Sequence, residues 1–167
     1  MRHVVSILIE NEAGALSRVV GLFSQRGYNI ESLTVAPTED QTLSRCTILT
    51  TGESEEIEQI TKQLHKLVCV LRVTAISEEP EGGLERELVL IKVPTPNRGI
   101  REDIKSIADI FSARIIDVSA EVITMEYVGS SQEVDNFCAT VLKLSDVLEV
   151  VRSGVLGIAR GNHCMHS

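Results

Sequence analysis

The feature that most constrains the fold is an apolar pattern that switches between strand and helix spacing and then repeats later in the chain. A continuous apolar run of strand length is followed by apolar residues at helical spacing, and then by two strand-like segments, a second helical stripe and a closing strand. The predicted elements are strand 4–9, helix 16–23, strand 30–35, strand 43–51, helix 54–67 and strand 68–76. The predicted order is βαββαβ.

A polar, acidic segment rich in glycine and proline, Ser77–Gly83, interrupts both kinds of spacing and marks a linker. After it the same order starts again, and a capping box at Ser130 and Glu133 predicts the start of the last helix. The predicted elements are strand 88–93, helix 100–111, strand 114–118, strand 121–128, helix 134–142 and strand 147–151.

Two βαββαβ units predict an α+β protein with two ferredoxin-like domains in tandem, each an antiparallel sheet with both helices on one face. The predicted boundaries are residues 1–76 for the first domain, 77–83 for the linker, 84–160 for the second domain and 161–167 for a flexible tail.

Composition argues against several classes of partner. The net charge is −8 and there is no tryptophan, so we expect no binding to phosphate backbones or to stacked single-stranded bases. No apolar run reaches 18 residues, so we expect no membrane span. Met1–His3 leads directly into a strand without a signal-peptide pattern, which predicts a cytoplasmic location.

Residue patterns that carry catalysis are missing from the sequence. It contains no G-x-S-x-G, P-loop or G-x-G-x-x-G motif, and its histidines have no evident orienting partner, so no catalytic residue is assigned. His163, Cys164 and His166 offer metal ligands, but one short stretch does not easily close a tetrahedral site. We therefore assign no metal site.

The segment between the first strand and the first helix has a possible binding role. The backbone N–H groups of Gly14, Ala15 and Leu16 lie at a helix N-terminus, where they could receive a carboxylate. Asn11 adds a donor and an acceptor, and Gly14 has no Cβ to block a ligand. This set suits a zwitterionic amino acid. The alternative for such a loop is a turn that Asn11 and Gly14 only shape and cap.

Several segments closely resemble the regulatory ACT domain family and, within it, the small subunit of bacterial acetohydroxyacid synthase, also called acetolactate synthase. The resemblance covers nearly the whole chain and is strongest in the first half. Its segments are Asn11–Arg18, Phe23–Val35, Ser44–Arg45, Gln63–Leu67 and Arg86–Val93.

This resemblance implies a homodimer that binds valine between its ACT domains and confers feedback inhibition in branched-chain amino acid biosynthesis. It also implies activation of a separate large catalytic subunit that uses thiamine diphosphate, FAD and magnesium, none of which this chain would bind. By position, the resemblance implies that Asn11, Gly14, Ala15 and Leu16 form the amino-acid cradle and that Asn29 and Ile30 of the neighbouring chain form its wall. The residues alone indicate only a turn residue at Asn29 and a core strand residue at Ile30.

Two other functions remain as alternatives. One is a stand-alone ACT-type amino-acid sensor that acts on a transcriptional or transport partner, and the other is an enzyme. The long resemblance disfavours the first, and the missing catalytic patterns disfavour the second. Valine, leucine and isoleucine share one backbone zwitterion, so the sequence does not distinguish between them.

Overall fold

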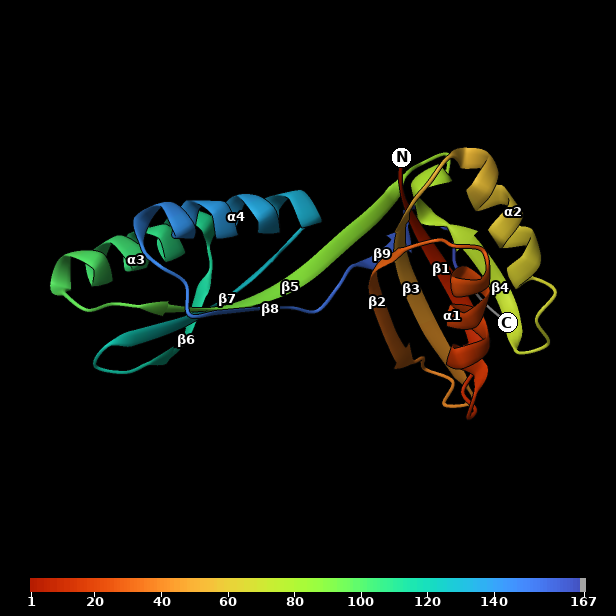
Figure 1. Cartoon of the computed structure of the whole chain (residues 1–167), viewed down its shortest axis with the longest axis horizontal. Helices are drawn as coiled ribbons and strands as arrows, with labels where there is room; N and C mark the ends of the chain where they lie inside the picture. The colour runs from red at the N-terminus through yellow and green to blue at the C-terminus, as the bar shows by residue number, and fades with distance from the viewer. Residues whose placement is uncertain (166–167) are drawn as a thin grey trace. The chain divides into compact units, whose positions relative to one another are not determined.

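The computed structural model describes residues 1–165 and divides the chain into two compact units. The first unit contains residues 1–84 and the segment that begins at Val155, and the second contains Glu85–Gly154. Each unit is an antiparallel sheet with two helices on one face, which confirms the predicted fold class (Figure 1). None of the helices in residues 1–165 has the length and hydrophobicity that crossing a bilayer requires.

The first unit has the strand order β2-β3-β1-β4. The side chains of β1 that face the helices, among them Val5 and Ile7, form the main core with apolar residues of β3 and of both helices. Its elements are β1 (Arg2–Glu10), α1 (Ala15–Gln25), β2 (Ile30–Pro37), β3 (Leu43–Thr51), α2 (Ser54–Leu64), β4 (Val70–Ala75) and the short 3-10 helix η1 (Ile76–Glu78).

The second unit repeats this arrangement with the strand order β6-β7-β5-β8. Phe111, Tyr127 and Phe137 pack together in its core, with ring centroids 4.8 to 5.9 Å apart. The predicted capping box is present, because Ser130 and Glu133 hydrogen-bond to each other's backbone N–H. Its elements are β5 (Gly83–Pro94), α3 (Arg98–Phe111), β6 (Arg114–Val118), β7 (Val122–Gly129), α4 (Ser131–Leu144) and β8 (Glu149–Arg152).

The C-terminal segment differs from the predicted division of the chain. Instead of staying in the second domain to residue 160, the chain returns to the first unit at Val155 and forms the short strand β9 (Leu156–Ala159). The return has a packing reason. Val155 is buried with Val4, Leu49 and Ile76 on the sheet face opposite the helices.

The segment predicted to be a flexible tail also makes contacts within the first unit. Arg72 donates a hydrogen bond to the carbonyl of Cys164 at 3.4 Å, and His163 Nδ1 lies 3.8 Å from a carboxylate oxygen of Glu79. His166, one of the metal ligands considered in the tail, lies outside the described residues together with residue 167.

A cluster of one arginine and two carboxylates joins three elements of the second unit. Arg152 on β8 donates to both carboxylate oxygens of Glu87 on β5, at 2.7 and 2.9 Å, and to Asp135 on α4 at 2.6 Å. Glu87 is 5% exposed, so Arg152 and not water is the main partner of its carboxylate. The hydrogen bonds from Arg152 to Glu87 also raise the pKa of Arg152.

We predict that Arg152→Ala lowers the free energy of unfolding by up to about 3 kcal/mol, because it leaves the Glu87 carboxylate buried without a partner. Arg152 is itself partly exposed, which keeps the effect below that of a fully buried pair. The control is Lys92→Ala, which removes an exposed pair with Glu149 and should change stability by less than about 1 kcal/mol. Urea denaturation measures both, and equal effects would contradict this role for Glu87.

We also predict that Val155→Asp lowers the free energy of unfolding of the first unit by more than about 3 kcal/mol, because the carboxylate would be buried without a partner. Val155 is 1% exposed, whereas nearby Val151 is 52% exposed, so Val151→Asp is the control and should be well tolerated. Hydrogen exchange of the β1 amides reports on the first unit separately. Unchanged protection in Val155→Asp would mean that the returning segment is not needed there.

Candidate functional site

The junction between β1 and α1 is built around Gly14, the N-cap residue of α1. Its φ is 88° and its ψ is −12°, in the left-handed region that glycine adopts easily and most side chains disfavour. A Cβ added at Gly14 would meet no atom within 4 Å. Backbone conformation, not lack of space in this chain, therefore favours glycine here.

The N-terminus of α1 is open. The helix has neither a side-chain cap hydrogen bond nor an acidic residue in its first turn. Ala15 N–H contacts the carbonyl of Glu12 at 3.4 Å, whereas the N–H groups of Leu16 and Ser17 have no hydrogen-bond partner within residues 1–165. Two backbone donors at the positive end of a helix dipole are suited to receive an anion.

Asn11 is anchored beside this helix end. Its side-chain amide donates to the carbonyl of Gln41 at 2.9 Å, and its backbone N–H donates to the carbonyl of Thr42 at 2.8 Å. The β2–β3 turn that receives these bonds is itself ordered by Thr42, whose hydroxyl and N–H donate to Asp40 and lower the pKa of that carboxyl group. The amide oxygen of Asn11 remains available to accept a hydrogen bond from a ligand.

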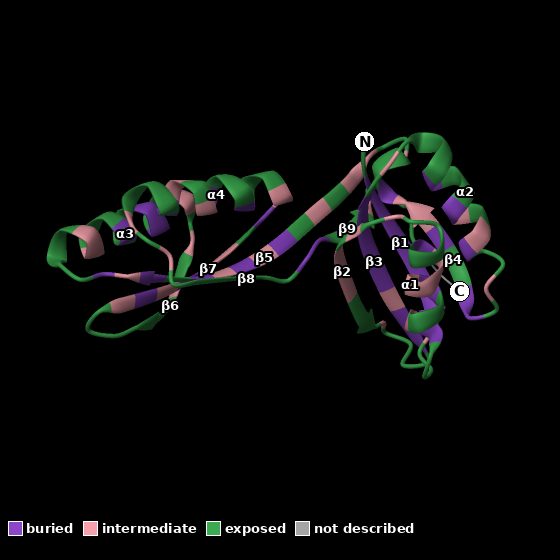
Figure 2. Ribbon diagram, viewed as in Figure 1, coloured by how far each residue is buried: buried purple, intermediate pink, exposed green. Residues whose placement is uncertain are grey.

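The other two residues predicted for the cradle divide between core and surface. The side chain of Ala15 is buried, so this residue could meet a ligand only through its backbone. Leu16 packs partly against the core and is partly exposed at the helix start. Figure 2 shows both buried and exposed residues along α1. The first turn of α1 therefore offers backbone donors next to a small apolar surface.

Asn29 and Ile30 lie at the opposite end of the same sheet. The carbonyl of Asn29 accepts a hydrogen bond from Thr50, which is also the strand partner of Ile30. The cradle end of β1 instead pairs with Leu43, seven residues away along β3 or about 24 Å. One chain therefore does not bring the two predicted parts of the site together, and a second chain would have to supply one of them.

The sequence prediction missed Ser17. Its N–H is one of the two open donors, because Ser17 is the third residue of α1 after the N-cap Gly14. The N-cap rule, under which the first helical residues lack partners, could have identified it once the helix start was placed at Ala15 and not at Leu16.

The described part of the chain contains no group of three or more His, Cys, Asp or Glu side chains placed to hold a metal ion. The open end of α1 can bind and orient a carboxylate through its backbone N–H groups. The chemistry that this arrangement supports is reversible binding.

Two family models match the chain. Residues 5–72 match the AHAS small subunit-like ACT domain, and residues 86–161 match the small subunit of acetolactate synthase. Together they cover most of both units, including β9.

Full-length relatives agree with these models. The chain is 52% identical to the acetolactate synthase isozyme 3 small subunit of Salmonella typhimurium and 51% identical to that of Escherichia coli, over 99% of each chain. The crystal structure of the acetolactate synthase small subunit from Thermotoga maritima is 39% identical and superimposes with a TM-score of 0.87, covering 98% of this chain and 99% of that one. The chain belongs to the family of acetolactate synthase small subunits.

Proposed function

We propose that this regulatory subunit activates the large catalytic subunit of acetolactate synthase and makes it sensitive to valine. The observation that carries the proposal is the open N-terminus of α1, where the N–H groups of Leu16 and Ser17 lie beside the anchored Asn11. These groups suit the carboxylate of an amino acid, while the amide oxygen of Asn11 suits its ammonium group.

A homodimer would complete the site. Strand β2 is an edge of the first sheet, and edge strands with unpaired backbone groups favour pairing with another strand. Its side chains Leu33 and Val35 are partly or largely exposed, which gives the edge an apolar surface. In the proposed dimer, Asn29 and Ile30 of the second copy lie against the cradle at Asn11–Leu16 of the first.

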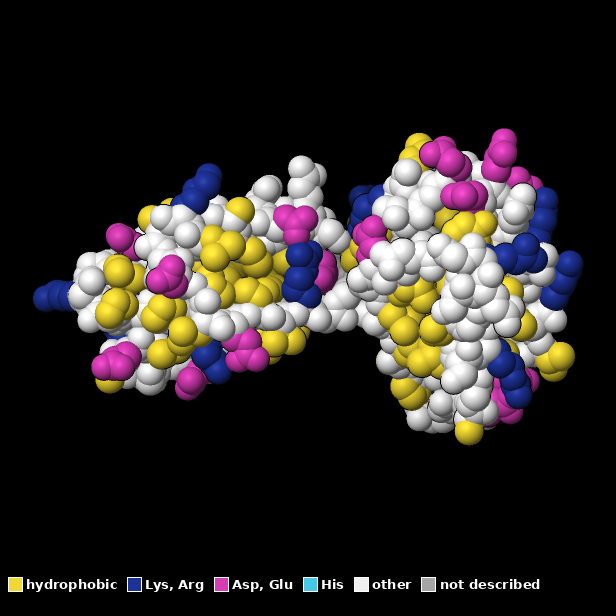
Figure 3. Space-filling model, viewed as in Figure 1, with side chains coloured by type: hydrophobic (Ala, Val, Ile, Leu, Met, Phe, Trp, Pro, Cys, Tyr) yellow, Lys and Arg dark blue, Asp and Glu magenta, His cyan; other side chains and the backbone are white. Residues whose placement is uncertain are grey.

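The proposed catalytic partner is a separate, larger chain that carries thiamine diphosphate, FAD and magnesium and acts in the cytoplasm. The second unit has an extensive apolar surface, part of which is visible in Figure 3, as is common for a subunit that binds another protein. Its large exposed side chains are Ile110, Ile116, Val118, Val128, Leu142, Leu144, Leu148, Val150 and Val151.

Inhibition requires valine to bind two states of the assembly with different affinity. A ligand shared by two chains stabilises the dimer arrangement that it fits, and it inhibits only when that arrangement is less able to activate the catalytic subunit. Equal affinity for both states would change nothing, however tight the binding.

The alternative is a stand-alone ACT-type sensor acting on another partner. Such a sensor would have the same cradle, so the discriminating property is association with a large thiamine-dependent chain. Similarity over the whole length of acetolactate synthase small subunits favours the regulatory subunit.

We predict that the purified chain forms no acetolactate by itself and raises the activity of its catalytic subunit when the two are mixed. We expect activation to come from contacts with the partner, because the sequence of this chain contains none of the catalytic motifs considered above. Acetolactate formation is measured with the catalytic subunit alone, with this chain alone and with both. Turnover by this chain alone, or a mixture no more active than the catalytic subunit, would contradict the proposal.

We also predict that Gly14→Asp largely removes the response to valine while Gly14→Asn keeps most of it. Asp and Asn both adopt the left-handed conformation more readily than most side chains and have nearly the same shape, so the two variants differ mainly in charge. Two unit charges 4 Å apart repel by about 1 kcal/mol in water and about 4 kcal/mol near a protein surface. Valine should therefore bind Gly14→Asp at least about fivefold more weakly than Gly14→Asn.

The measurement is a valine titration of acetolactate formation by each reconstituted variant. Circular dichroism and activation of the catalytic subunit without valine show whether each variant is folded. If folded Gly14→Asp and Gly14→Asn respond to valine equally, the carboxylate does not bind at the start of α1.

A further inference from the structure

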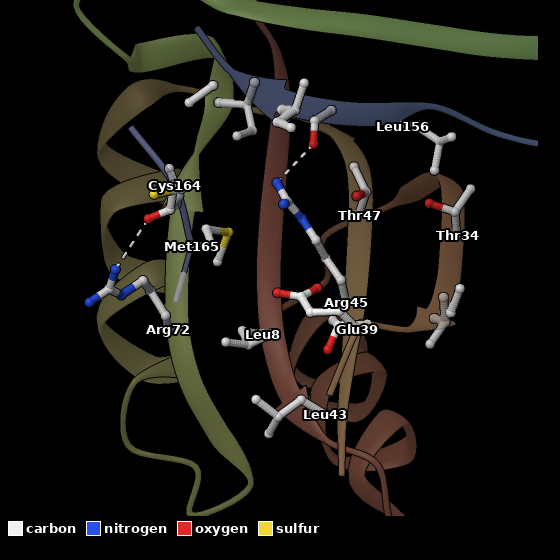
Figure 4. A pocket seen from close by; sticks show the side chains of 18 of the residues that line it. Leu8, Thr34, Glu39, Leu43, Arg45, Thr47, Arg72, Leu156, Cys164 and Met165 are labelled. Carbon is white, nitrogen blue, oxygen red and sulfur yellow. Dashed lines mark hydrogen bonds between the residues drawn. The ribbon is translucent and has the colours of Figure 1, made fainter. Parts of the chain in front are cut away.

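A groove of about 640 Å³ lies within the first unit, on the sheet face opposite α1 and α2. Its floor is apolar where Leu8 and Leu43 lie, and Leu156 and Met165 of the returning C-terminal segment border it (Figure 4). The volume is in the range of pockets that enclose small ligands. The cradle at Asn11–Leu16 contributes no residue to this groove.

Arg45 on β3 points into the groove and is held in place by neutral groups (Figure 4). Its Nε donates to the hydroxyl of Ser6 at 2.7 Å, and its Nη2 donates to the carbonyl of Gly157 at 2.9 Å. No carboxylate oxygen in residues 1–165 lies within 4.0 Å of the Arg45 guanidinium, the distance expected of an ion pair. Burial lowers the pKa of Arg45, the effect expected of a charge with too little compensation. The charge of Glu39 at the rim of the groove acts from farther away and has the smaller, opposite effect of raising the pKa of Arg45.

A fixed guanidinium with this surplus of donors is suited to one class of ligand. An arginine has five N–H donors, and the bonds of Arg45 to Ser6 and Gly157 leave three for a ligand. Its planar fork matches a carboxylate in a bidentate pair. A carboxylate would also neutralise a charge that Ser6 and Gly157 leave uncompensated.

The sheet register places a second cation across the apolar floor. Leu8 pairs with Arg45 on one side and with Arg72 on the other, so one row across three strands reads arginine, leucine, arginine. At about 4.8 Å between strands, the two arginine backbones are about 10 Å apart. This row offers positive charge at both sides of a surface that suits an aliphatic group.

We propose that the groove binds a small monocarboxylate with an aliphatic body, whose carboxylate pairs with Arg45 and whose body lies over Leu8 and Leu43. The site uses the other face of the sheet from the proposed valine cradle, and it does not depend on the proposed function. Since no residue of the groove belongs to α1, occupation of one site leaves the atoms of the other exposed.

The probe for this site is 3-methylbutanoate, which has a branched apolar body and a carboxylate but no ammonium group. Binding to the full chain is measured by calorimetry, and amide chemical shifts in NMR spectra locate the bound probe. We expect the shifts to concentrate at Leu8, Arg45 and Gly157. The uncharged analogue 3-methylbutanamide should bind at least about tenfold more weakly, because it cannot form the charged pair.

Arg45→Met should weaken binding of 3-methylbutanoate by at least about tenfold, because it removes a charge-assisted bidentate contact. Arg45→Lys keeps the positive charge but not the planar guanidinium, and it should weaken binding several-fold. This second variant tests the role of Arg45 even if Arg45→Met loosens β9 by removing the bond to Gly157. The control is Arg114→Met, which removes an 80% exposed strand arginine of the second unit and should leave affinity unchanged.

Three results would overturn the proposal: no binding at about 10 mM probe, unchanged affinity in both folded Arg45 variants, or shifts confined to Ala15–Ser17. The last result would place the probe in the valine cradle instead. Titration of valine into Gly14→Asp tests that cradle separately, so failure at one site is distinguishable from failure at the other.

Discussion

The structure depends first on the burial of β1 on both of its faces. Seven consecutive residues of this strand are buried, and its two neighbours β3 and β4 both pair with it. Because side chains alternate across a strand, those on one face of β1 are covered by helices, and those on the other face need a second covering element. Helices α1 and α2 supply the first, and η1 with the returning segment at Val155 supplies the second.

The proposed valine site is a consequence of how β1 ends. The chain leaves the strand, reverses at Gly14 and starts α1 with no side chain to cap it. As a result, the N–H groups of Leu16 and Ser17 have no partner among the described residues. At the helices of the second unit, side chains of Asn97 and Ser130 accept from the corresponding groups. An uncapped helix end lowers the stability of the helix slightly, and a bound carboxylate can compensate for the missing cap. Ligand binding and local stability are therefore linked at this point.

The two faces of the first sheet offer different chemistry because different elements cover them. On the helix face, the N-terminus of α1 presents the backbone N–H groups of Leu16 and Ser17. On the other face the covering segment is a single short strand. Arg45 lies partly buried there between Ser6 and Gly157, with no ion pair to any residue in 1–165. A site for an ammonium-bearing acid and a site for a bare carboxylate are therefore compatible within one sheet.

Local pattern was sufficient for most of the fold. The alternating and helical spacings predicted both βαββαβ units, and the start of β3 at Leu43, the start of α2 at Ser54 and the capping box at Ser130 were each placed correctly. These predictions were correct because each feature depends on residues only a few positions apart. For the site, the sequence suggested the segment from Asn11 to Leu16, and the structure adds that the α1 N-terminus is open there.

Tertiary structure alone decided the features that join distant segments. The return of Val155 to the first unit and the position of Arg45 under Gly157 depend on contacts between residues more than 100 positions apart, which no local spacing encodes. The separation of Asn29 from the cradle likewise follows from the register of β3 with β1 and β2. The short distance in sequence between Asn29 and the cradle does not predict it. The sequence by itself determined which segments become strands and helices, because periodicity and capping act locally. Only the folded chain determined which faces are covered, and by which part of the chain.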